Sequence, residues 1–102
     1  MEGRNDRIRL KVEPALKGLM AGFFENRRRD LERLSRALGD GDLAAIRDVG
    51  QNIRCFSRVY GVEGLTALGE AIRCAAEEES RQRIALLHGQ LADYLARVEI
   101  QE

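Results

Sequence analysis

The sequence is poor in the residues that catalytic and metal sites most often use. It has one histidine, His88, no tryptophan and two cysteines, Cys55 and Cys74, which form neither a CxxC pair nor another metal-ligand spacing. A metal site made of His88, Cys74 and the acidic run 77–79 would need ligands from two helices, and nothing in the spacing demands it. We therefore expect no metal ion, no cofactor and no enzymatic activity.

Strand signals are also scarce. Aromatic residues make up 5% of the chain, proline occurs once, β-branched residues are few, and polar and apolar residues do not alternate. The single chain of 102 residues is long enough for one domain with a modest core. These features together predict an all-α domain packed through leucine, isoleucine and alanine.

Excess charge of one sign is missing as well. Lys+Arg and Asp+Glu both number 17, and no apolar run approaches the ~18 residues that a membrane span needs. The basic run 27–29 is followed at once by Asp30 and Glu32, which cancel most of its field. We expect no nucleic-acid or membrane partner. Because no secretory signal is recognisable, we also expect reduced thiols and a cytoplasmic protein.

Apolar residues recur at helical spacing through most of the chain. The pattern predicts a short helix near 13–21 and a longer one near 22–38, either continuous or kinked between them, and further helices near 42–60, 62–79 and 81–98. The architecture that follows is an antiparallel up-down four-helix bundle with a short extra N-terminal helix.

The ends and turns complete this prediction. Residues 1–12 are expected to be flexible, 13–98 to form the bundle and 99–102 to be a tail. Gly39 is the predicted left-handed cap of one helix and Asp42 the N-cap of the next. So short a connection makes the two flanking helices antiparallel neighbours.

The helix near 42–60 has two distinct faces. On a wheel that advances about 100° per residue, Ile53 marks the apolar side, with Phe56 on its flank. Gln51, Cys55 and Arg58 lie on the opposite, solvent side. An outward cysteine is unusual, because free cysteine is among the most buried residue types. The polar face of this helix is therefore the best candidate for a functional surface.

The same helix resembles the histidine phosphotransfer (HPt) domain of bacterial phosphorelays. That family has a phosphorylated His, an aliphatic residue two positions later, then Lys and Gly, and a second Gly ten positions after the His. Here Gly61 matches the distal Gly, Ile53 the aliphatic residue and Arg54 the Lys, while Cys55 replaces the small Gly. Gln51 stands where the phosphorylated His would be.

The flanking segments resemble the family in the same order, and the likeness covers roughly residues 13–98. The matching positions are the segments 24–31 and 37–42 and the residues Leu65, Leu68, Gly69 and Ile72. The resemblance implies the four-helix fold and a partner that is a response-regulator receiver domain or a sensor histidine kinase. It also implies that phosphotransfer is lost, because the neutral amide of Gln51 cannot form a phosphoramidate.

The expected partner-binding residues follow from this resemblance. They are Gln51, Arg54, Cys55 and Arg58, joined by Arg28 and Leu31 of the preceding helix. Leu31 is included because two helices antiparallel about residues 40–41 place it opposite Gln51. The degenerate domain would then sequester its partner or compete with a true phosphotransfer protein, and we expect it to be a monomer.

Three alternatives remain open. The chain is an active phosphocarrier if Cys55 or His88 accepts the phosphoryl group instead. It is a plain helical scaffold or oligomerisation protein if only the bundle is shared, because fold does not imply function. It is a redox sensor if the arginines near Cys55 activate the thiol.

Overall fold

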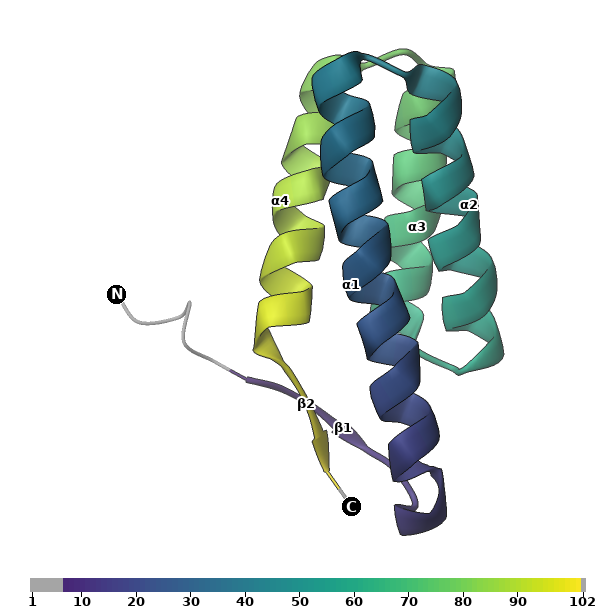
Figure 1. Ribbon diagram of the computed structural model, residues 1–102, viewed down its shortest axis with the longest axis vertical. Coiled ribbons are helices and arrows are strands. Elements are labelled where there is room, and N and C mark those ends of the chain that lie inside the picture. Colours follow the sequence, from purple (N-terminus) through teal and green to yellow (C-terminus); the bar gives the residue numbers. More distant parts are fainter. Residues whose placement is uncertain (1–6, 102) are drawn as a thin grey trace.

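Four helices form the body of the molecule. The computed structural model describes residues 7–101, and Figure 1 shows the helices side by side along the long axis. Their bounds are α1 Lys17–Asp40, α2 Leu43–Val59, α3 Glu63–Glu77 and α4 Arg81–Arg97. The predicted all-α four-helix bundle is confirmed. No helix among residues 7–101 is long and apolar enough to cross a membrane.

The N-terminal helical segment is continuous apart from one initial turn. Pro14–Leu16 form a short 3-10 helix, η2, and α1 then runs unbroken through Gly18 and Gly22. Each glycine inside a helix costs about 1 kcal/mol relative to alanine. The burial of Phe24 and its neighbours in the core offsets that cost, and α1 extends beyond the other helices at its first turns.

The turn between α1 and α2 uses a different glycine from the one predicted. Gly41 has φ of 68° and closes α1 in the left-handed conformation, while Gly39 is an ordinary exposed position inside the helix. Asp42 is the N-cap, as predicted, and accepts a hydrogen bond from the Ala45 amide at 3.1 Å. Gly41 takes the left-handed position because α1 continues to Asp40, so Gly41 and not Gly39 follows the last helical residue.

The core lies between the four helices and is almost entirely aliphatic. Each helix contributes fully buried side chains, among them Phe24, Leu34, Ile46, Ile53, Leu65, Ile72, Ile84 and Leu91. Their spacing is the periodicity that predicts the helices from the sequence. The Phe23–Phe24 pair is buried, and its two rings meet edge to face at 5.0 Å.

A pair of short strands corrects the expectation that the chain has no β-structure. β1, Ile8–Lys11, pairs in parallel with β2, Val98–Gln101, with Ile8 opposite Val98. Each strand alternates half-buried and exposed residues over only four positions. That length is too short to stand out in the sequence, and the pairing exists only because the bundle brings the two segments together. Residues 1–6 and 102, part of the segments predicted to be loose, lie outside the described residues.

Candidate functional site on helices α1 and α2

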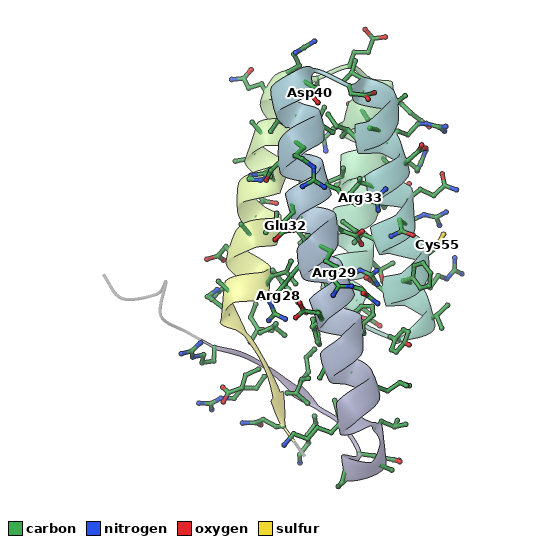
Figure 2. All side chains as sticks on the ribbon, in the orientation of Figure 1. Arg28, Arg29, Glu32, Arg33, Asp40 and Cys55 are labelled. Atoms are coloured by element: carbon green, nitrogen blue, oxygen red, sulfur yellow. The ribbon has the colours of Figure 1, made fainter. Side chains whose placement is uncertain are left out.

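Gln51 lies midway along α2 with an exposed side chain. Together with Arg47, Asp48, Asn52 and Cys55 it lines a shallow hollow on the outer surface of the helix. Figure 2 shows Cys55 at the outer edge of the bundle, directed into solvent. The structure therefore brings Gln51 and Cys55 together on an open surface, as the helical wheel predicts.

A buried carboxylate lies beneath this surface. Asp30 of α1 is only 3% exposed and accepts hydrogen bonds from Arg27 Nε at 2.9 Å and Arg33 Nη1 at 3.2 Å. Asn52 of α2 donates to both carboxylate oxygens at 3.2 Å. A buried charge is tolerated when it is paired and hydrogen-bonded in this way. The cluster joins α1 to α2 at the level of Gln51.

Arg27 supports an aromatic ring on the surface. Its guanidinium carbon lies 4.9 Å from the ring centroid of Phe23 and 5.1 Å from that of Phe56. Phe56 is 49% exposed, although its place beside the apolar stripe predicts a more buried position. The Phe56 ring therefore packs on the Arg27 guanidinium at the surface and not in the apolar core.

An apolar groove continues from Phe56 along the first turns of α1. It is called the α1–α2 groove below, and its lining comprises Gly18, Leu19, Gly22, Phe23, Asn26, Arg27, Phe56 and Tyr60. Phe23 and Tyr60 stack at 4.6 Å and hold its two sides together. Two apolar side chains of this lining are exposed, Leu19 at 59% and Phe56 at 49%. Apolar surface gathered in this way is typical of interaction sites.

Arg54 and Arg58 lie on the other side of α2, toward α3. They line a second hollow with Glu63, Thr66 and Glu70. Arg54 Nε is 3.3 Å from Glu70 Oε1, so its charge is already paired. The structure thus places Arg54 and Arg58 beside each other but separates them from the hollow that holds Gln51.

A close approach between α2 and α3 makes this ion pair possible. A Cβ on Gly69 would lie 2.5 Å from the Arg54 amide nitrogen and 2.8 Å from the Gly50 carbonyl oxygen. Only glycine allows the two backbones to come so near. The same approach brings Glu70 within reach of Arg54, and the hydrogen bonds that Arg73 donates to Glu70 lower the pKa of that carboxyl below its ordinary value.

The two α1 residues predicted to join the site have other surroundings. Arg28 donates a hydrogen bond to the Leu95 carbonyl at 3.3 Å, and Figure 2 shows it on the α4 side of α1. Leu31 is half-buried against the core. The register is nonetheless as predicted, because the Asp30–Asn52 contact preserves the antiparallel alignment that sets Leu31 opposite Gln51.

Sequence reasoning missed the ion pair between Arg27 and Asp30, which lies on the side of α1 that faces α2. Arg27 and Asp30 are three positions apart on one helix, a spacing that favours ion pairs. This spacing is the feature of the sequence that could have indicated the pair. Nothing in the sequence indicates that the pair is buried. That follows only from the packing of α2 over it.

Other reactive groups lie away from Gln51. Ser35 Oγ of α1 and His88 Nε2 of α4 share a hydrogen bond of 2.6 Å on the α1–α4 side. Cys74 is half-buried, and desolvation together with the nearby Glu70 carboxylate raises the pKa of its thiol. Among residues 7–101, no three His, Cys, Asp or Glu side chains converge so that they could hold a metal ion.

No family model matches this chain, and searches of curated proteins and of solved structures give no significant match either. The function is therefore inferred from the side chains of residues 7–101 and their geometry. Around Gln51 they offer an exposed amide, an exposed thiol, a half-exposed aromatic ring and an apolar groove. Such a surface is suited to binding another protein.

Proposed function

We propose that this chain is an HPt-like binding module that docks a response-regulator receiver domain or a sensor histidine kinase without transferring phosphate. The main support is the position of Gln51. It is exposed midway along the second long helix of a four-helix bundle, where the HPt-like pattern places the phosphorylated residue. A phosphorelay partner must reach that position from solvent, and the open hollow around Gln51 permits it.

The chemistry of the surface favours binding over transfer. The amide of Gln51 has no nucleophilic nitrogen, so it cannot hold a phosphoryl group covalently. Cys55 and Phe56 occupy positions where smaller residues would let a phosphate donor approach closely. The module would therefore hold its partner in a complex and compete with active phosphotransfer proteins.

Phe56 is the expected anchor of this complex. Interface energy concentrates in a few aromatic and arginine residues that become fully desolvated. The Phe56 ring already packs against Arg27, so its side chain loses less conformational entropy when a partner binds. Arg29 of α1 and Arg58, on the α3 side of α2, are exposed and supply positive charge toward a receiver, whose phosphoryl site is an aspartate.

Titration calorimetry of the full chain against the host's receiver and kinase domains tests this function. We expect one of them to bind, and Phe56→Ala to weaken that binding by roughly thirtyfold, as loss of about 2 kcal/mol implies. Leu86→Ala is the matched control, because Leu86 is an exposed apolar residue on α4. The proposal is wrong if no receiver or kinase binds, or if both substitutions weaken binding equally.

A further inference from the structure

The small parallel sheet has an open edge on the side of β1. Among residues 7–101 it contains only two strands, and so short a sheet is marginally stable by itself. Figure 1 shows both strands beside the overhanging first turns of α1, away from α2. Val98 and Ile100 of β2 line a hollow there together with Phe24 of α1. The sheet is thus supported on one face by the bundle.

The backbone groups at this edge are directed outward. The Val12 amide donates to the Gln101 carbonyl at 2.6 Å, so the peptide groups of Val12 point toward β2. Successive residues of a strand turn their N–H and C=O groups to opposite sides. Those of Arg9 and Lys11 therefore point away from β2, and they form a row of donors and acceptors that another strand can pair with.

The side chains at the edge select the kind of strand that fits. Arg9 and Lys11 are exposed, while Ile8 and Leu10 are half-buried. β2 already shows a matching partner, because Glu99 is aligned with Arg9 and lies 3.9 Å from it. Opposite charges on neighbouring strands are favourable, and like charges are not. A matching strand thus carries acidic residues in alternation with apolar ones.

We propose that the open edge of β1 binds an extended segment of a partner protein in which acidic and apolar residues alternate. The added strand takes main-chain hydrogen bonds from the Arg9 and Lys11 peptide groups. Its acidic side chains lie beside those two cations, and its apolar side chains continue the half-buried row formed by Ile8 and Leu10. This surface is separate from the one around Gln51, so the two sites can be tested independently.

A second copy of this chain does not fit the edge by adding its β2 in parallel or its β1. If β2 of one copy added to β1 of the next, successive copies would be only about 10 Å apart, since neighbouring strands are ~4.8 Å apart. The molecule measures 19 Å even along its shortest axis, so the bundles would overlap. Pairing of β1 with another β1 would bring Arg9 and Lys11 against like charges.

A labelled peptide tests the proposal directly. The probe is a fluorescein-labelled hexapeptide, Val-Glu-Val-Glu-Val-Glu, titrated with the full chain and followed by fluorescence anisotropy. We expect saturable binding, and roughly tenfold weaker binding of a peptide of the same composition whose glutamates are contiguous. Two further peptides carry N-methyl groups on alternate residues: one peptide is methylated at its valines and the other at its glutamates. Only the peptide whose methyl groups lie on the edge that pairs with β1 should lose binding. Equal binding of both peptides would overturn the proposal.

A charge swap in the protein separates recognition from folding. In the variant Arg9→Glu, Lys11→Glu, Glu99→Arg, the charge pair between β1 and β2 is kept in reverse, so the sheet is preserved. We expect this variant to lose the acidic peptide and to bind Val-Lys-Val-Lys-Val-Lys instead. Arg36→Glu, at an exposed position of α1, is the control and should leave binding unchanged. Unchanged binding of the acidic peptide by the swapped variant, or self-association of the native chain that the swap abolishes, would refute the proposal.

Discussion

Asn52 of α2 donates to both carboxylate oxygens of Asp30 of α1, at 3.2 Å each. This contact sets the alignment of the two helices directly below the surface that carries Gln51. Because Asp30 also binds Arg27, and Arg27 in turn supports Phe56, the buried carboxylate positions the exposed ring. The stability of the bundle and the shape of the proposed docking surface therefore depend on the same cluster.

Removal of the buried carboxylate should be costly. We expect Asp30→Ala to lower the free energy of unfolding by about 3 kcal/mol, because it leaves Arg27 buried at 4% exposure without its counter-ion. Urea denaturation measures the change. Asp93→Ala is the control: the Arg97–Asp93 pair is partly exposed, and its loss should cost less than about 1 kcal/mol. Similar losses for the two variants would contradict the role given to Asp30.

The close contact between α2 and α3 should not tolerate a methyl group. We expect Gly69→Ala to destabilise the protein by about 2 kcal/mol or more, because the new Cβ would press on the backbone of Arg54 and Gly50. Gly89→Ala, in α4, is the matched control. Nothing lies within 4 Å of its Cβ, and alanine should stabilise the helix by about 0.5–1 kcal/mol. Thermal unfolding of both variants measures these opposite signs.

Restoration of the lost residue tests the alignment with HPt domains. We expect the native chain to take no label from a receiver charged with radioactive acetyl phosphate, and Gln51→His with Cys55→Gly to become labelled. The physical reason is that an imidazole at this exposed position supplies the missing nucleophilic nitrogen. Labelling of the native chain that is lost in His88→Ala or Cys55→Ser would instead show an active phosphocarrier.

The two cysteines should differ in reactivity. Cys55 is exposed, whereas Cys74 is half-buried and burial raises the pKa of its thiol. A raised pKa means less thiolate at a given pH, so Cys74 should react more slowly than Cys55 near pH 8. The reaction rate of Cys74 should continue to increase as the pH rises above ~8.5. Reaction of Cys55→Ser and Cys74→Ser with Ellman's reagent compares the two thiols. Equal rates at pH 8 would contradict this expectation, and a sluggish Cys55 would argue against a redox-sensing role.

The exposure of Phe56 and the pairing of the two short strands could not be predicted from sequence patterns. Helical periodicity places Phe56 beside the apolar stripe, but its actual half-exposed position depends on Arg27, which approaches from another helix. The strands Ile8–Lys11 and Val98–Gln101 are each four residues long and nearly ninety positions apart. Such short alternation carries little information until the two segments are brought together.

The sequence by itself determined the helices, their antiparallel order and the outward face of α2, because these depend on local periodicity, caps and short turns. Only the tertiary structure decided that Arg27 and Asp30 are buried, that Arg28 lies toward α4, and that Arg54 is paired with Glu70. Each of these depends on which residues of a second helix cover the first. Burial and ion pairing are properties of packed surfaces, and a single helix's pattern does not contain them.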